Sequence, residues 1–294
     1  MDKTKKPLAV MTMVYEDYDF LKRWYDYYAG QVEAENLFVF SHGNDSEHKN
    51  IAKGANVLNV PRDPEMLKFD KRRWRMLGDF ASGLLNFYNW ALVTDVDEMV
   101  VVDPDISVSL IDYLENMYPD ISKAPRNISP LGLNLIHIPE EEPLPILENE
   151  LILSRRRFFH PSRVYSKPTL VRLPVSFAPG GHRNNLGLRT LSDDLYLVHL
   201  KFFDMKEAIE RSKKQAALIE VNTTTGSEDH VWLKSLDAYQ VVRDTYSIGP
   251  EDISLPEIRA AMMKQKQKFK ESYIWGQFEN RTLFQLPTRF SSLF

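Results

Sequence analysis

Three carboxylates within four positions are the residues of this sequence best placed to do chemistry. Asp95, Asp97 and Glu98 lie between two apolar runs, residues 90–93 and 99–102. The first run has the composition of a strand buried on both faces. Carboxylates are costly to bury unless they are paired or bind a cation. At the carboxyl end of such a strand we therefore expect them to face the crevice where open α/β sheets bind ligands.

The spacing of these acids indicates a metal-assisted phosphate site. Asp95 and Asp97 are two positions apart, so on an extended chain their side chains point to the same side. Two oxygen ligands on one side suit Mg²⁺ or Mn²⁺, which usually keeps several waters and also binds substrate phosphates. The alternative is a pair of solvated acids in the turn after a strand. Glu98 points away from both Asp residues, and we expect it to be a structural partner.

Composition restricts the class of protein. The 294 residues, 43% hydrophobic and 27% charged, are typical of a globular protein with one large domain or two. A net charge of −4 gives no electrostatic footprint for nucleic acid. The absence of cysteine excludes disulfides, thiol catalysis and Cys-ligated zinc. With no signal segment and no run of ~18 apolar residues, we expect a cytoplasmic protein.

Strands that alternate with helices position the carboxylates. The apolar periodicity predicts strands at 8–14, 36–41, 57–60 and 90–93, with helices through 20–28 and 66–85. This alternation predicts a parallel sheet built from βαβ units. Farther along, the patterns predict helices at 106–118, 204–220 and 256–273, and strands at 131–138, 167–173 and 195–200.

Two loops are expected at the same sheet edge as Asp97. Tyr15 and Glu16 follow the first strand, and His42, Asn44 and Asp45 follow the second. The carboxyl ends of parallel strands share one edge, so these loops can form a nucleotide pocket. The alternative is a set of ordinary surface loops.

Two histidines downstream are candidate ligands. His182 follows Gly180 and Gly181, which let backbone approach a ligand closely. His199 interrupts an apolar strand near its end, as either a satisfied core histidine or a third metal ligand.

Three charged stretches have two interpretations each. Residues 71–75, which include Arg73, and residues 155–157 either face a diphosphate or form solvated surfaces. Glu228 and Asp229 are an acidic pair that either supplies a catalytic base or favours a helix N-terminus.

The order of these features resembles the family 2-like glycosyltransferases with a GT-A fold, in particular a bacterial subgroup that is also similar to the family 92 enzymes. The resemblance covers roughly residues 8–204. The segments that carry it are Val14-Tyr15-Glu16, Leu37-Phe38-Val39-Phe40 with Asn44-Asp45-Ser46, Val93-Thr94-Asp95-Val96-Asp97-Glu98, Lys167-Pro168-Thr169-Leu170-Val171 with Gly181-His182, and Val198-His199-Leu200-Lys201. Tyr15, Met99 and Leu200 depart from the usual residues of the subgroup.

This resemblance implies a GT-A (Rossmann-like) α/β fold with a mixed, mainly parallel sheet flanked by helices. The catalytic domain would span 1–204, with a nucleotide-sugar half (1–104) and an acceptor half (105–204), and residues 205–294 would form a helical C-terminal extension. It also implies the roles of the site residues. Asp95 would contact the ribose or a metal-bound water, and Asp97 would hold the divalent metal through the donor diphosphate. His199 would be the third contact to the metal or phosphate. Glu16 and Asp45 would line the nucleoside pocket, and His182 would approach the diphosphate or the acceptor.

The resulting hypothesis is a metal-dependent, inverting glycosyltransferase with a DXD motif and Mn²⁺ or Mg²⁺ as cofactor. It would move a sugar from a nucleotide-diphosphate-sugar to a glycan or glycolipid acceptor in surface polysaccharide synthesis, without a nucleic-acid partner. The lysine- and aromatic-rich tail, residues 264–294, is a candidate for homo-oligomer contact or for peripheral contact with the inner membrane. The alternatives are a non-catalytic glycan-binding protein on the same scaffold and, ranked lower, an Asp-x-Asp phosphohydrolase.

Overall fold

Parallel strands form the N-terminal half of the central sheet. In the computed structural model, β1 (Lys6–Val14) pairs in parallel with both β2 (Leu37–His42) and β4 (Tyr88–Val93). On the far side of β2, β3 (Asn56–Val60) is also parallel. The predicted strands are thus confirmed, and the sheet order here is β4-β1-β2-β3. The structure describes residues 1–62, 68–147, 149–222, 244–250, 254–270, 272–277 and 282–294.

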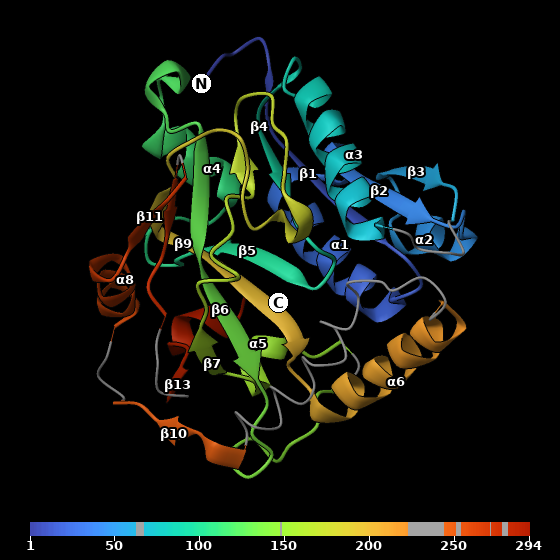
Figure 1. The fold of residues 1–294 in the computed structure, drawn as a ribbon, viewed down its shortest axis with the longest axis vertical. Helices are drawn as coiled ribbons and strands as arrows, with labels where there is room; N and C mark the ends of the chain where they lie inside the picture. Colours follow the sequence, from blue (N-terminus) through green and yellow to red (C-terminus); the bar gives the residue numbers. More distant parts are fainter. Residues whose placement is uncertain (63–67, 148, 223–243, 251–253, 271, 278–281) are drawn as a thin grey trace.

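Helices cover both faces of these strands (Figure 1). Alternate residues of β1 face opposite sides, so Leu8 and Val10 join one apolar cluster while Ala9 and Met11 join another. On the first side packs α1 (Tyr18–Val32), with Trp24 among its buried residues, and on the second packs α3 (Phe69–Leu84). Between β2 and β3 lies a short helix, α2 (Ser46–Ile51), where only a loop was expected.

The second half of the sheet is mostly antiparallel. The strands that follow β4 are β5 (Glu98–Val102), β6 (Asn127–Ile136), β7 (Phe158–Pro161), β8 (Leu170–Val171) and β9 (Thr190–Phe202). Antiparallel pairs join β5 to β9, β6 to β7, and β8 to both β4 and β6. β6 and β9 run in parallel, with register shifts along their length. The described chain therefore forms an α/β fold with a large mixed sheet flanked by helices. The short helices α4 (Leu110–Met117) and α5 (Ile152–Arg155) lie in this half.

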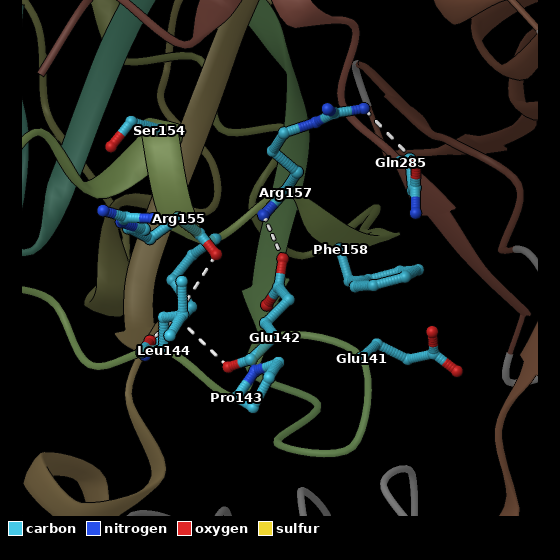
Figure 2. A pocket seen from close by; sticks show the side chains of 10 residues that line it. Glu141, Glu142, Pro143, Leu144, Ser154, Arg155, Arg157, Phe158 and Gln285 are labelled. Carbon is cyan, nitrogen blue, oxygen red and sulfur yellow. Dashed lines mark hydrogen bonds between the residues drawn. The ribbon is translucent and has the colours of Figure 1, made fainter.

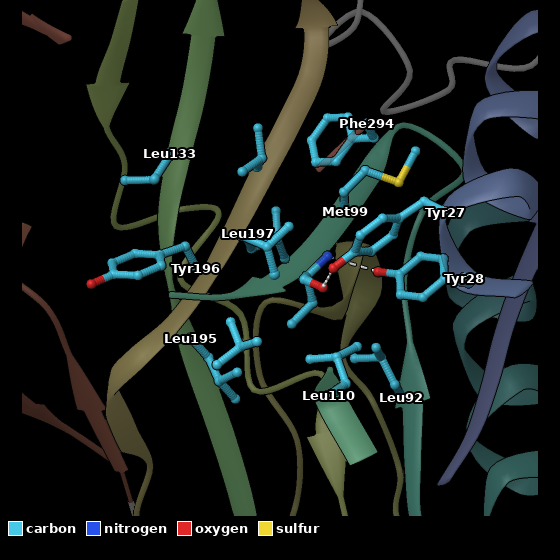
Figure 3. Close-up of a cluster of buried hydrophobic side chains, with 14 of the residues drawn as sticks. Tyr27, Tyr28, Leu92, Met99, Leu110, Leu133, Leu195, Tyr196, Leu197 and Phe294 are labelled. Atoms are coloured by element: carbon cyan, nitrogen blue, oxygen red, sulfur yellow. Dashed lines mark hydrogen bonds between the residues drawn. The ribbon is translucent and has the colours of Figure 1, made fainter. Parts of the chain in front are cut away.

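Two tyrosines of α1 form hydrogen bonds that hold β5, the first strand of this second half of the sheet, in place. Tyr27 Oη donates to the carbonyl of Val100, and the amide of Val100 donates to Tyr28 Oη at 2.7 Å. Figure 3 shows the two rings next to each other near Met99, in the main apolar cluster that also contains Leu197. Buried hydroxyls need such partners. These bonds therefore attach β5, and the turn that precedes it, to α1.

The C-terminal segment contains strands as well as helices. α6 (Met205–Asn222) was expected, but the predicted helix at 256–273 is wrong beyond α8 (Leu255–Lys264), because the hairpin β11 (Gln267–Phe269) and β12 (Ser272–Ile274) follows it. β13 (Thr282–Gln285) pairs with β7 and with β10 (Ser247–Ile248), so this segment joins the main sheet. Phe290 and Phe294 are buried in the main cluster. The 3-10 helices are η1 (Ala34–Asn36), η2 (Ile121–Lys123), η3 (Pro179–Gly181) and η5 (Thr288–Phe290).

No helix in the described ranges combines the length and the apolar character that crossing a membrane would require.

Candidate functional site

The turn between β4 and β5 carries Asp95 and Asp97. Its start is fixed by Thr94, whose amide donates to the carbonyl of Met11 and whose Oγ1 accepts from Trp24 Nε1 at 2.9 Å. Its end is fixed by the Asp97 carbonyl, which accepts from the amide of Leu200. The turn lies at the carboxyl end of a strand buried among parallel neighbours, where the sequence predicted it.

Asp95 lies between two cationic side chains. Arg73 Nη1 is 2.8 Å from Oδ1, and Lys167 Nζ is 2.9 Å from Oδ2. Burial opposes ionisation here, but Arg73 and Lys167 together outweigh it and hold the pKa of Asp95 well below its usual range. Both carboxylate oxygens thus take part in ion pairs.

Glu98 is the structural partner of this cluster. Its side chain is fully buried, Oε1 lies 2.6 Å from Lys167 Nζ, and Oε2 accepts from the Asp95 amide. Lys167 belongs to a segment beside the end of β4, because the Val93 amide donates to the carbonyl of Thr169. Burial would favour neutral Lys167, but the charges of Asp95 and Glu98 outweigh it and raise the pKa of the ammonium group above its ordinary value.

His199 faces Asp97 with a defined tautomer. Nε2 lies 3.8 Å from Asp97 Oδ2, and Nδ1 lies 2.7 Å from Oδ1 of Asn134. An amide oxygen accepts, so Nδ1 carries the proton and Nε2 presents its lone pair toward Asp97. Burial lowers the pKa of His199 to about 3, which keeps the ring neutral. Tyr165 stacks on the ring at 3.7 Å between centroids.

Asp97 and His199 fit a divalent cation better than Asp95 does. A carboxylate oxygen and an imidazole nitrogen 3.8 Å apart can both contact one ion bound between them. Either carboxylate would have to exchange an ion pair to become a ligand, but Asp95 is paired through both oxygens, with Arg73 and Lys167, whereas the ion pair of Asp97 with Arg211 involves Oδ2. Among the described residues, no group of three or more His, Cys, Asp or Glu is arranged to hold a metal ion. A divalent ion between Asp97 and His199 would thus have two protein ligands among the described residues, and its other positions would be open to waters and phosphate oxygens.

Arg211 of α6 also reaches Asp97. Nη1 donates to Asp97 Oδ2 at 2.7 Å, while Nε and Nη2 donate to the two carboxylate oxygens of Asp17 at 3.0 and 2.8 Å. Asp17 stands at the N-cap position of α1 with a left-handed φ of 41°, but its side chain makes no capping bond and binds Arg211 instead.

The loops after β1 and β2 come together as expected. The Arg62 guanidinium lies 3.6 Å from the centroid of the Tyr15 ring, and the Tyr15 and His42 rings meet edge to face at 6.0 Å. His42 stacks on Phe69, the first residue of α3, at 4.7 Å. Aromatic and guanidinium faces of this kind suit a planar base.

Strained backbone marks the same loops. Glu16, Asp17 and Asn44 all have positive φ, between 41° and 59°. Non-glycine residues reach this region at an energetic cost, and such strain clusters at ligand-binding sites. Asp45 has a local structural role, since it caps α2 through Glu47 and accepts from Tyr18 Oη at 2.8 Å.

His182 lies near the Asp95 cluster. Its Nδ1 is 3.0 Å from the carbonyl oxygen of Val164. Burial, followed by the charge of Lys167, lowers the pKa of His182 to about 4, so the ring is neutral at pH 7. Gly181 has φ +67°, and a methyl group at this position would overlap the Trp74 ring. Glu228 and Asp229, the predicted acidic pair, lie outside the described residues.

The two basic stretches separate in space. Arg73 reaches Asp95, whereas residues 155–157 line a hollow of about 270 Å³ on another part of the molecule (Figure 2). There Arg156 is buried and donates to the carbonyl oxygens of Phe203 and Leu144. Arg156 therefore has a structural role, and no sequence pattern distinguished it from Arg73.

Sequence reasoning missed four residues around the site: Asn134, Tyr165, Lys167 as an ion-pair partner, and Arg211. Two of them carried a signal. Asn134 is a polar residue within the otherwise apolar stretch 131–136, and Lys167 lies three residues before the short buried strand β8. Arg211 carried none, because its contact depends on where α6 lies.

The site thus belongs to an α/β protein with acids, cations and a neutral histidine gathered where parallel strands end. No protein-family model and no curated protein matches the chain. Among solved structures, mannose-1-phosphate geranyltransferase from Thermus thermophilus is similar at 13% identity, over 79% of this chain and 68% of that one, with a TM-score of 0.25. A likeness at this level defines neither the fold family nor the activity.

Proposed function

We propose that this protein is a cytoplasmic glycosyltransferase with a GT-A fold that uses a divalent metal to move a sugar from a nucleotide-diphosphate-sugar to a hydroxyl acceptor in surface polysaccharide synthesis. The observation that supports this most strongly is the Asp97–His199 pair, with Nε2 facing the carboxylate and Nδ1 held by Asn134. It lies at the sheet edge that binds ligands in open α/β folds.

The proposed divalent ion, Mn²⁺ or Mg²⁺, would supply electrostatic stabilisation of the charge that develops on the leaving diphosphate. Asp97 and His199 would hold it. Arg73 and Lys167 keep Asp95 ionised and place two positive charges beside it, where a ribose or a phosphate can be positioned.

The aromatic loops would hold the nucleoside. Tyr15, His42 and Phe69 offer ring faces and edges, and Arg62 covers the Tyr15 ring. Neutral His182 would hydrogen-bond the diphosphate or the acceptor hydroxyl. Glu228 or Asp229 stays the proposed base of an inverting displacement.

Turnover of a panel of nucleotide sugars, with and without Mn²⁺, tests this proposal. We expect Mn²⁺-dependent consumption that falls roughly 100-fold or more in Asp97→Ala and in His199→Ala, because each removes a group that would hold the ion. Asp79→Asn, an exposed carboxylate on α3, is the matched control and should leave turnover unchanged. Glycan binding without turnover or metal effect would support a binding protein, and phosphate-ester hydrolysis without transfer a phosphohydrolase. Either result would overturn the proposal.

A further inference from the structure

Arg211 contacts the oxygen that a metal ion would need. Its Nη1 is 2.7 Å from Asp97 Oδ2, the same atom that lies 3.8 Å from His199 Nε2. The guanidinium is largely enclosed, with 16% of its side chain exposed, and it packs over the Phe20 ring at 4.3 Å. A divalent ion between Asp97 and His199 would therefore meet a fixed positive charge on its own ligand.

Asp17 holds the other edge of the same guanidinium. The two-pronged pairing uses Nε and Nη2, so one planar group bridges the loop after β1 and the β4–β5 turn. Paired this way, an arginine is held in one orientation. This bridge attaches α6 to the site, whereas Asp204, the residue before α6, is held away from the site by Arg156 at 3.3 Å.

We propose that Arg211 is a stand-in cation: it neutralises Asp97 in the metal-free protein and leaves Asp97 when a divalent ion binds there. This inference rests on the proposed function, because it takes Asp97 and His199 as the metal ligands. Metal binding then competes with the attachment of α6, and Arg211 sets how tightly the site binds its ion.

Substitution of Asp17 distinguishes competition between Arg211 and the metal from a purely electrostatic effect of Arg211 on metal affinity. If Arg211 only adds positive charge near the ion, removing the negative charge of Asp17 should weaken metal binding. If Arg211 must leave Asp97, loss of Asp17 removes part of what holds Arg211 in place and should strengthen metal binding. The two accounts predict opposite signs for one substitution.

The experiment measures Mn²⁺ affinity of the full chain by calorimetry, without nucleotide, for the wild type, Arg211→Gln, Asp17→Asn, Asp97→Ala and Arg23→Gln. We expect about tenfold tighter binding in Arg211→Gln and about threefold tighter binding in Asp17→Asn. Arg23, on α1 and 5.5 Å from the Phe203 ring, is the charge-matched control and should change the affinity less than about twofold. Amide exchange around Arg211 should rise when Mn²⁺ is added to the wild type.

Three results would overturn the inference. Equal Mn²⁺ affinity in the wild type and Arg211→Gln, with binding still lost in Asp97→Ala, would leave the metal site standing but remove the competition. Weaker binding in Asp17→Asn would assign Arg211 a purely electrostatic effect. Absence of Mn²⁺ binding in every variant would remove the proposed metal site together with the inference.

Discussion

His199 and Asn134 are register partners on the parallel strands β9 and β6, and they are also joined through their side chains, with Nδ1 and Oδ1 2.7 Å apart. Strand pairing thus places the amide oxygen where it fixes both the ring orientation and the tautomer of the histidine. Groups that hold a ligand in this way are a regular part of metal sites. The central sheet therefore orients the proposed metal ligand directly.

Replacement of Asn134 should weaken metal binding without removing a ligand. We expect Asn134→Ala to lower Mn²⁺ affinity roughly 10-fold, because the imidazole loses its fixed tautomer and orientation. Calorimetric titration measures the effect. The control is Asn86→Ala, because the side-chain amide of Asn86 donates to the carbonyl of Gly83 near the end of α3, away from the site. Unchanged affinity in a folded Asn134→Ala protein would show that the contact with Asn134 does not organise the site.

Loss of Lys167 should destabilise the fold. Its side chain is 2% exposed and stands between Asp95 and Glu98, so Lys167→Met leaves a buried carboxylate without its partner. Breaking a buried pair in this way costs about 3–5 kcal/mol of unfolding free energy. Urea denaturation measures the loss, and the double variant Lys167→Met with Glu98→Gln should recover part of it.

The exposed ion pair of Lys22 and Asp26 provides the control for the Lys167 substitution. Lys22→Met should cost no more than about 0.5 kcal/mol. If the two lysine substitutions had similar effects, the buried cluster around Lys167 would not stabilise the fold as described.

Gly181 should not tolerate a side chain. Its φ is +67°, and an added methyl group would overlap the Trp74 ring, which packs in the apolar cluster of α3. We expect Gly181→Ala to cost about 2–4 kcal/mol from overlap and backbone strain. Gly30 lies within α1, and a methyl group added there would have no neighbour within 4 Å, so Gly30→Ala should stabilise the fold by about 0.5–1 kcal/mol. Thermal unfolding of both variants checks the opposite signs.

Glu142 should make the fold less stable as pH rises. Burial raises the pKa of Glu142 to about 7, above its ordinary value of 4.5. Between these values the folded state binds more protons at Glu142 than the unfolded state does, so the contribution of Glu142 to stability is greatest below pH 4.5 and falls until the pH passes 7. Glu142→Gln should remove a loss on the order of 1 kcal/mol between pH 5 and 8. Urea midpoints at both pH values measure it, with the exposed neighbour Glu141→Gln as control. A slope unchanged by Glu142→Gln would contradict this role.

The local sequence pattern was enough to predict the strands and helices of the parallel half of the sheet. β1, β2 and β4 each contain a largely apolar run, and α1 and α3 follow the helical spacing of their buried residues. Because parallel strands end at one edge, the location of Tyr15, His42 and Asp97 along that edge was also predictable. The helix expected at 256–273 failed because the alternating lysines in 264–270 have the period of a strand, and β11 contains Lys268.

The charged contacts of the site were not predictable. Arg211 and Asp97 are 114 positions apart, and Lys167 and Asp95 are 72 apart. Whether such residues meet depends on how α6 and the segment before β8 pack on the sheet, which no local periodicity encodes. The sequence pattern therefore located the acids but could not show which cations neutralise them.

The central claim is that Asp97 and His199 bind a divalent ion together with the donor diphosphate. Thermal unfolding with a panel of nucleoside diphosphates, with and without Mn²⁺, tests this most directly, since a ligand that binds only the folded state raises its stability. We predict that at least one nucleoside diphosphate raises the melting temperature only when Mn²⁺ is present, and that Asp97→Ala abolishes this increase. No increase with any of them, or an equal increase in Asp97→Ala, would contradict the claim.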